Sequence, residues 1–211
     1  MEECAKFAEE VLAPINAIGD QQGATIKDGK VTMPKEFIDA YKSFSEAGWA
    51  SISLPSEIGG GGMPIALSGG TLEILSTANL AFGLAPGLAA GAISAINFHG
   101  SEDQKAKFLP KLVSGEWTGT MNLSEPQSGS DLGTITTKAE PLEDGSYKIT
   151  GTKVWITFGE HDLTDNIIHL VLAKIPGSPE GTKGISMFIV PKVMVNDCLL
   201  YTSDAADDAS S

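Results

Sequence analysis

The sequence predicts an α+β protein, in which an N-terminal all-helical domain is followed by an antiparallel β-barrel-like domain. In the first 116 residues apolar side chains recur at the three- and four-residue spacing of helices, whereas after Glu116 short β-rich runs alternate with turn-forming residues. The strands are grouped and do not alternate with helices, which argues against a parallel βαβ sheet. We therefore divide the 211 residues into a helical domain at 1–116, a β domain at 117–192 and a tail at 193–211.

Two amphipathic helices are expected near the start of the chain. Pro14 lies within the first and is expected to kink it, because proline lacks an N–H group. The apolar face of this helix consists of Cys4, Phe7, Ala8, Val11, Leu12, Ile15 and Ile18. Pro34 is expected to start the second helix, which ends near Gly48. Its inward side chains are Phe37, Ile38, Tyr41 and Phe44.

The stretch Ile74–Ser101 contains no charged residue, which raises the question of a membrane span. However, it consists largely of Ala and Gly, which contribute little insertion free energy, and it is interrupted by Asn79 and Pro86. Two tightly packed helices are the better interpretation, so we expect no membrane span. Ser101–Gln104 then forms a capping box at the start of another helix.

The β domain begins with a clear hairpin signal. Lys138–Glu140 and Tyr147–Thr150 flank the turn dipeptide Asp144-Gly145. Further β-rich runs are Thr152–Phe158, Ile167–Ile175 and Gly184–Val190. These runs predict an antiparallel β domain.

The last residues differ in composition from the rest of the chain. Ser203–Ser211 is small, acidic and aperiodic, which is typical of a disordered segment. Cys198–Asp208 also resembles the translation of a sequencing adapter. We therefore expect 193–211 to be a disordered or non-native tail.

Composition excludes several classes of function. The 27 acidic residues exceed the 14 basic ones, the net charge is −13, and every Lys/Arg position is lysine. An acidic chain without arginine is a poor candidate for binding nucleic acid. Cys4 and Cys198 form no CxxC motif, so neither a disulfide framework nor a thiolate metal site is indicated. Met1 is followed by two glutamates and not by a basic and then an apolar segment, so we expect a cytoplasmic location without a signal peptide.

Three suggestive patterns have simpler structural interpretations. Gly59–Gly62 matches neither the GxGxxG nor the Walker spacing, so a flexible turn is favoured over a phosphate cradle. His99, His161 and His169 are too dispersed in sequence to indicate a metal site. Ser128–Ser130 does not form the GxSxG motif of serine hydrolases.

Met121–Gly133 and Gly151–Gly159 are the two segments that indicate a binding site. The first ends a strand in a turn rich in hydroxyls, glycines and backbone amides, which can bind an anion without a basic residue. A Ser/Gly hairpin corner is the simpler alternative for this turn, and a tryptophan in a β-rich run is usually a core residue. Ser124 and Thr157 are 33 residues apart (157 − 124) with a hairpin between them, which allows two strand ends to meet at one site.

In combination these segments resemble the acyl-CoA dehydrogenase family. Asn122–Asp131 corresponds to the family's first signature, with Asn122 in place of the usual Gly, Ala or Cys. Trp155-Ile156-Thr157 corresponds to its Trp-Ile-Thr triplet, and Gly100–Gly115 and the turn from Pro55 to Pro64 are similar to its helical domain. Within the family, Met121–Gly133 together with Gly159–Ile167 is most similar to the branch that contains 3-methylthiopropanoyl-CoA dehydrogenase.

The resemblance implies an FAD-dependent oxidoreductase of fatty acid metabolism that desaturates an acyl-CoA thioester. A carboxylate removes the α-proton and the β-hydride passes to flavin N5; an electron-transfer flavoprotein usually accepts the electrons. The residues implied to bind FAD are Met121, Asn122, Leu123, Ser124, Gly129, Ser130, Trp155, Ile156 and Thr157.

Individual roles follow from the same resemblance. The amide of Leu123 or Ser124 and the Ser124 hydroxyl would bond the pyrimidine edge of the flavin. Thr157 would bond near N5, and Trp155 would pack against the ring. Ser130 would also touch the acyl-CoA substrate.

The sequence departs from the family after the β domain. The family's catalytic glutamate belongs to a C-terminal four-helix domain, and no helical pattern follows Val193. The general base is therefore unknown, and the motif carboxylates Glu125 and Asp131 are interpreted as structural. We expect a fragment whose parent enzyme forms homo-oligomers, and which alone is inactive and holds FAD weakly. The alternatives are an acyl-CoA oxidase-like relative and a non-catalytic flavin-binding or interaction module.

Overall fold

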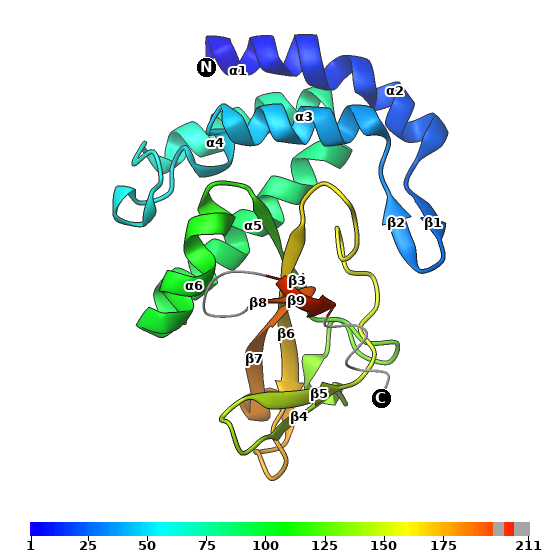
Figure 1. Cartoon of the computed structure of the whole chain (residues 1–211), viewed down its shortest axis with the longest axis vertical. Coiled ribbons are helices and arrows are strands. Elements are labelled where there is room, and N and C mark those ends of the chain that lie inside the picture. The colour runs from blue at the N-terminus through cyan, green and yellow to red at the C-terminus, as the bar shows by residue number, and fades with distance from the viewer. Residues whose placement is uncertain (196–200, 205–211) are drawn as a thin grey trace.

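The computed structural model describes residues 1–195 and 201–204. In this part of the chain a helical domain precedes a sheet domain, as predicted (Figure 1). The helices are α1 (Glu2–Phe7), the π-helical η1 (Ala8–Leu12), α2 (Ala13–Gln22), α3 (Lys35–Glu46), α4 (Ile65–Ala78), α5 (Leu80–His99) and α6 (Glu102–Val113). The strands are β1 (Thr25–Lys27), β2 (Lys30–Thr32), β3 (Trp117–Asn122), β4 (Lys138–Pro141), β5 (Tyr147–Thr150), β6 (Asn166–Lys174), β7 (Ile185–Pro191), β8 (Val193–Val195) and β9 (Tyr201–Asp204).

Local signals place the helix ends where the sequence predicts them. α3 begins directly after Pro34, and Gly48 beyond its end has a left-handed φ of 74°. The side chain of Ser101 accepts a hydrogen bond from the Gln104 N–H (3.2 Å), and the Gln104 side chain accepts one from the Ser101 N–H (2.9 Å). The predicted capping box of α6 is therefore confirmed. Pro14 lies in the first turn of α2, directly after the wide π-helical turn, which accommodates a residue that cannot donate a backbone hydrogen bond.

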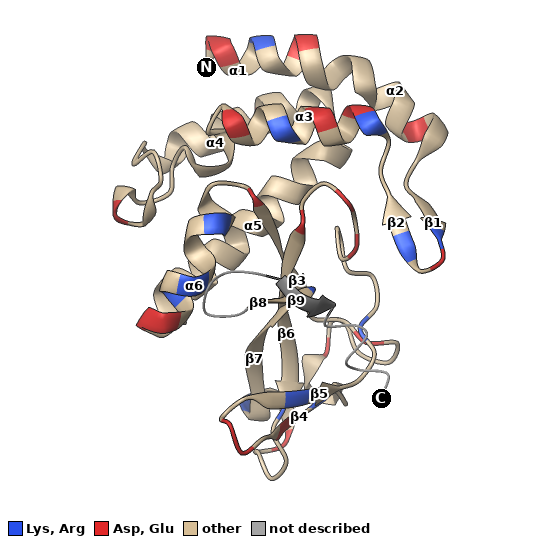
Figure 2. Ribbon diagram, viewed as in Figure 1, with Lys and Arg blue, Asp and Glu red and all other residues tan. Residues whose placement is uncertain are grey.

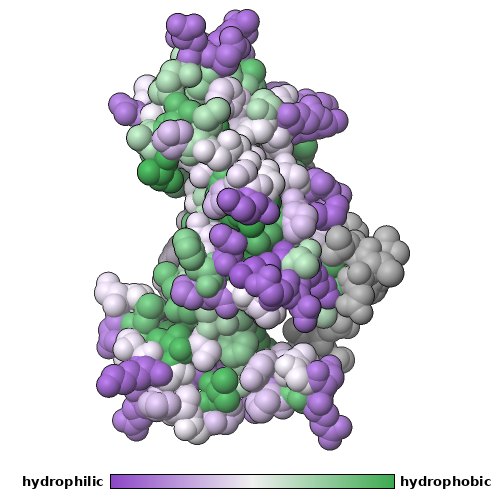
Figure 3. All heavy atoms as spheres, turned by 90° about the vertical axis from the view of Figure 1, so that its left-hand side faces the viewer, coloured by the Kyte–Doolittle hydropathy of each residue, from purple (hydrophilic) through white to green (hydrophobic). Residues whose placement is uncertain are grey.

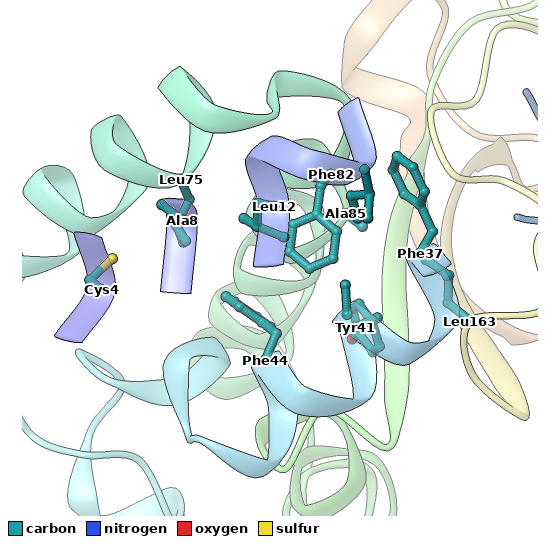
Figure 4. Packing of buried hydrophobic residues seen from close by; sticks show 12 residues of the cluster. Cys4, Ala8, Leu12, Phe37, Tyr41, Phe44, Leu75, Phe82, Ala85 and Leu163 are labelled. Carbon is teal, nitrogen blue, oxygen red and sulfur yellow. The ribbon is translucent and has the colours of Figure 1, made fainter. Parts of the chain in front are cut away.

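The core of the helical domain is an aromatic cluster between α3 and α5 (Figure 4). The rings of Phe44 and Phe82 meet edge to face with centroids 5.6 Å apart. Tyr41 and Phe37 extend the cluster along α3, and each is at most 3% exposed. Leu163, which belongs to the sheet domain, also packs here, so the two domains share this core.

A glycine allows α5 to approach the sheet closely. A Cβ on Gly119 of β3 would lie 2.4 Å from the Cβ of Ala92 on α5. The second half of α5 therefore lies against β3, as Figure 1 shows. Ile93, Ile96, Leu112 and Trp117 form a second buried cluster at this contact.

The sheet is mixed and open, which corrects the predicted antiparallel, barrel-like domain. The β4–β5 and β6–β7 pairs are antiparallel, but β3 and β4 each pair with β6 in parallel. The chain leaves β3 and returns as β6 only after a long connection that contains the β4–β5 hairpin, and such a crossover permits a parallel pair. Strands β3, β6, β4 and β5 form a path that does not close on itself.

Two further expectations differ from the structure. Thr152–Phe158 is not a strand, because Trp155 and Phe158 have left-handed φ angles of 59° and 52° that no strand contains. The segment expected to be a disordered tail contains β8 and β9, which pair with each other, and Val195 is buried. Residues 196–200 and 205–211 of that segment lie outside the described residues.

Figure 2 shows that no charged residue lies on α5. Among the described residues α5 is long and apolar enough to cross a membrane by length and composition, and 44% of its most apolar window is buried within this protein. Its inner face packs against α4, α6 and β3, in agreement with the predicted packed helices. Leu80, Leu84 and Phe98 are exposed on its outer face. In the side view of Figure 3, hydrophobic surface likewise occurs in patches between hydrophilic side chains.

Candidate functional site

The loop after β3 is a rigid turn. The backbone groups of Glu125 and Ser128 bond each other in both directions, at 2.7 and 3.0 Å. The Ser128 hydroxyl donates to the carbonyl of Asp131, and the Asp131 carboxylate accepts from the Gly133 N–H (2.9 Å). Asp131 is thus a turn former, and the exposed Gly129 and Ser130 lie between these anchors.

Backbone bonds join the two predicted site segments. The Val154 N–H donates to the carbonyl of Ser124 (3.0 Å), and the Lys153 ammonium donates to the carbonyl of Leu123 (3.0 Å). The two segments therefore meet, although only the first of them ends a strand. Among the described residues the side chains of Ser124 and Thr157 do not bond each other.

The carboxylate of Glu125 is buried and fully engaged. It accepts hydrogen bonds from the backbone and hydroxyl groups of Thr136 and Thr137, from Gln127 and from Lys153. Burial alone would raise the pKa of Glu125, but these hydrogen bonds hold its pKa well below the usual range. An ionised carboxylate with saturated lone pairs is a poor general base, which favours the structural interpretation of Glu125.

Trp155, Ile156 and Thr157 form a strained and outward-facing arch. Trp155 is 91% exposed and has a left-handed φ, and Phe158 at the other end has one too. A left-handed backbone at a bulky residue costs about 1–3 kcal/mol and persists only where its surroundings enforce it. Exposed aromatic rings and strained backbone are both typical of ligand-binding positions.

The loop after the arch fastens it to the helical domain. Phe158 and Leu163 pack against the aromatic core, and the carboxylate of Asp162 accepts a hydrogen bond from the Met33 N–H (2.8 Å). His161 is 1% exposed and bonds the Thr118 hydroxyl of β3 through Nε2 (3.0 Å). Burial above all, with the nearby Lys192 charge, lowers the pKa of His161 to about 4.

Sequence reasoning did not find this anchoring loop. The signal was the pair of apolar residues Phe158 and Leu163 within an otherwise polar segment, since apolar side chains in a loop usually have a packing partner.

A cavity of about 640 Å³ lies beside the anchoring loop, between α2, α3 and Phe158. Its lining includes Asp20, Met33 and Phe37, but none of the nine predicted site residues. The predicted site residues are therefore separate from this cavity.

The predicted site residues occupy three places. Met121 and Asn122 end β3, with the half-buried Leu123 and Ser124 after them. Gly129 and Ser130 lie on the exposed part of the turn; a Cβ on Gly129 would be 3.9 Å from Ser124 Oγ. The third place is the arch of Trp155, Ile156 and Thr157.

The site side chains are suited to a flat ligand with hydrogen-bonding edges. Within the described part of the chain the hydroxyls of Ser124, Ser130 and Thr157 have no hydrogen-bond partner, so they are free to serve a ligand. The exposed indole of Trp155, in the same arch as Thr157, offers a flat apolar face. In contrast, the described residues contain no group of three or more His, Cys, Asp or Glu side chains that could hold a metal ion.

Comparison with known proteins identifies the class to which this fold and site belong. The model of the acyl-CoA dehydrogenase N-terminal domain matches residues 1–116, and that of the acyl-CoA dehydrogenase middle domain matches residues 120–197. The chain belongs to the acyl-CoA dehydrogenase family.

Individual proteins are similar to this chain over most of its length. The chain is 48% identical over 197 residues to a 3-methylmercaptopropionyl-CoA dehydrogenase of Ruegeria pomeroyi, covering 93% of this chain and 34% of that protein. It is 28% identical to an acyl-CoA dehydrogenase of Bacillus anthracis complexed with FAD, with a TM-score of 0.73 over 90% of this chain and 30% of that one. A second structure is described as an electron transferring flavoprotein of Acidaminococcus fermentans, studied for flavin-based electron bifurcation. It is 28% identical to this chain with a TM-score of 0.73, and the match covers 90% of this chain and 46% of that one. The chain thus spans about a third of the curated relative's length.

Proposed function

We propose that the chain is the N-terminal and middle part of an FAD-dependent acyl-CoA dehydrogenase that desaturates an acyl-CoA thioester between Cα and Cβ. The observation that carries this proposal is the joining of Leu123–Ser124 to the Trp155–Thr157 arch by the Val154 and Lys153 hydrogen bonds. Among the residues that the structure describes, the joined segments carry the unbonded hydroxyls of Ser124 and Thr157 and the exposed indole of Trp155. When bound there, FAD supplies the acceptor for the substrate hydride.

The residues divide the work of holding that cofactor. The Ser124 hydroxyl and the amide of Leu123 or Ser124 would donate to the pyrimidine edge, where donors stabilise negative charge on the reduced ring. Thr157 would donate near N5, and Trp155 would shield the ring from water. Met121, Asn122, Gly129 and Ile156 would line the site, and Ser130 would contact both FAD and the acyl-CoA.

The general base lies outside the group of carboxylates that this site contains. Glu125 already accepts six hydrogen bonds, from Gln127, Thr136, Thr137 and Lys153, and Asp131 caps the turn at Gly133. Proton removal from the substrate therefore needs a carboxylate that a further part of the parent protein provides.

The parent enzyme's partners are part of the same proposal. We include an acyl-CoA substrate, an electron-transfer flavoprotein as acceptor, a homo-oligomeric state, a cytoplasmic location and a role in fatty acid metabolism. The Ruegeria relative supports the thioester substrate and the Acidaminococcus structure supports the electron acceptor. An oxidase-like relative remains the alternative enzyme, and oxygen consumption on addition of acyl-CoA would distinguish it.

Thr157→Ala in the full-length parent tests the site. Loss of one donor near N5 is expected to slow flavin reduction by about 10- to 100-fold, because a preorganised donor at a developing charge contributes a few kcal/mol. Stopped-flow flavin absorbance under single-turnover conditions measures this rate. The matched control is Thr152→Ala, an exposed threonine of the same segment, which should leave the rate unchanged. An unaltered rate in Thr157→Ala would remove that residue from the site.

A further inference from the structure

Lys153 is a buried lysine in an acidic protein. Its side chain is 9% exposed and that of its partner Glu125 is 1% exposed, with the ammonium and carboxylate 2.9 Å apart. Removing two charges from water costs several kcal/mol per ion, and the cost is offset only where further hydrogen bonds satisfy both groups. Here Thr136, Thr137 and Gln127 complete the carboxylate, and the carbonyl of Leu123 accepts from the ammonium.

The pair connects three stretches of backbone that are distant in sequence. Lys153 bonds Leu123 and Glu125, and the next residue, Val154, bonds Ser124. Consecutive residues of one segment are thus matched to consecutive residues of the other. Through Glu125 the same pair also holds the backbone of Thr136 and Thr137 at the far end of the turn.

The arch needs such an anchor on its N-terminal side. The Trp155 side chain is 91% exposed, so it cannot hold its own left-handed backbone through packing. On the C-terminal side Phe158 is held by the aromatic core of the helical domain. On the N-terminal side the nearest buried side chain that bonds the opposite segment is Lys153, two residues before Trp155.

We propose that Lys153, through its ion pair with Glu125, is a positioning residue that sets the Trp155–Thr157 arch against Leu123–Ser124. This inference rests on the proposed function, because those two segments are the proposed flavin-contacting groups. It assigns to the ion pair a role in site geometry that is separate from general stability. Neither residue is among the proposed flavin-contacting residues.

The matched variants are Lys153→Met and Lys174→Met. Lys174 is also a partly buried lysine at this turn, and its ammonium donates to the carbonyl of Gly133 (2.7 Å), but it joins neither site segment to the other. Each variant removes one ammonium and keeps an apolar stem of similar length. Both are made in the 211-residue chain and in the full-length parent.

Amide hydrogen exchange in the chain measures the position of the arch. Lys153→Met is expected to increase exchange at Val154, whose amide donates to Ser124, at least tenfold while the amides of β6 stay protected, and Lys174→Met is expected to change neither. In the parent, FAD titration is expected to give a dissociation constant at least tenfold higher for Lys153→Met than for Lys174→Met. If Lys153 only stabilised the fold, Lys153→Met would increase amide exchange in β6 and in the arch together, and the two variants would have similar dissociation constants for FAD. That result would overturn the proposal.

Lys153→Met leaves the Glu125 charge buried and unpaired, and the variant could fail to fold for that reason alone. A second variant tests the proposal in that case. The double variant Glu125→Gln/Lys153→Met removes both charges, and the same two measurements apply to it. The failures of the two proposals differ. If the wild-type parent binds no FAD, the proposed function is wrong, whereas unchanged exchange at Val154 in the variants shows that the ion pair does not position the arch.

Discussion

His161 lies between the anchoring loop and β3 as a neutral imidazole. Its Nδ1 accepts from the Leu163 N–H (3.2 Å), so the ring proton is on Nε2, which donates to the Thr118 hydroxyl. The Thr164 hydroxyl donates to the carbonyl of Asn166, so Thr118 in turn donates to Thr164. Protonation of Nδ1 would break the hydrogen bond from the Leu163 N–H. This hydrogen-bond network therefore favours the neutral imidazole.

This arrangement predicts a loss of stability in mild acid. The pKa of His161 is about 4 in the fold, against 6.5 for the free side chain. Burial is the main cause of this decrease. The positive charge of Lys192 and the nearby His169 also lower the pKa, whereas Asp162 raises it. The unfolded chain therefore binds the extra proton first, so stability is complete above pH 6.5 and falls as the pH drops towards 4. At pH 5 the loss from this residue is about 2 kcal/mol, from about 1.5 pH units at 1.36 kcal/mol each.

Urea denaturation of the wild type and His161→Gln at pH 7.5 and pH 5 measures this loss. The glutamine does not titrate, so the variant should lose about 2 kcal/mol less than the wild type between the two pH values. Glu125 does not disturb this comparison. Because its pKa is lowered in the fold, its contribution to stability is lost only at pH values below the ordinary pKa of 4.5. The control His99→Gln removes an exposed histidine and should keep the wild-type difference. An identical pH dependence for His161→Gln and the wild type would contradict the prediction.

At the scale of elements, the close contact between α5 and β3 positions the sheet beneath the helical domain. The contact is close because Gly119 has no side chain opposite Ala92. β3 leads directly into the turn that carries Leu123 and Ser124, so the depth of this packing sets where the turn begins.

Gly119→Ala is expected to destabilise the protein by about 1–3 kcal/mol, because its Cβ would overlap Ala92 and force apart two packed elements. Gly91→Ala is the matched control. It lies on the open face of α5, where an added Cβ meets nothing within 4 Å, so it should stabilise the helix by about 0.5–1 kcal/mol. Chemical denaturation measures the change in the free energy of unfolding for both variants. The two changes should have opposite signs if this packing is correct and the same sign if it is not.

At the scale of the whole molecule, the anchoring loop couples the two domains. Leu163 belongs to the sheet domain in sequence but is 9% exposed within the helical core, near Phe37 and Tyr41 (Figure 4). Together with the Asp162–Met33 hydrogen bond it joins the arch to the helices. The two domains are therefore expected to unfold as one unit.

Leu163→Ala tests this coupling. The cavity it leaves is expected to lower the free energy of unfolding by about 2–4 kcal/mol and to separate the unfolding of the two domains. Near-ultraviolet circular dichroism follows the aromatic helical core, and amide hydrogen exchange at β6 along the same denaturant series follows the sheet domain, so their midpoints should diverge. Leu142→Ala, at an exposed position of the β4–β5 hairpin, should change stability by less than about 0.5 kcal/mol and keep the midpoints together. Coincident midpoints in Leu163→Ala would show that the loop does not couple the domains.

Features with a local cause were predictable from the sequence. Pro34, the Ser101–Gln104 capping box and the Asp144-Gly145 turn each act on backbone groups a few residues away, and the structure contains all three. The arch was not predictable in the same way. Its β-branched and aromatic residues favour a strand, whereas the ion pair of Lys153 and the packing of Phe158 enforce left-handed backbone at either end.

The sequence by itself determined the order of a helical and a sheet domain, the starts of α3 and α6 and the two segments from which the candidate site is built, because periodicity, capping and turn chemistry act over short distances. Only the tertiary structure decided the parallel pairing of β3 with β6, the open sheet, the strained arch and the burial of His161. Each of these depends on contacts between residues 28 to 129 positions apart, such as Lys153 with Glu125 and Asp162 with Met33, whose formation is governed by packing and not by local preference.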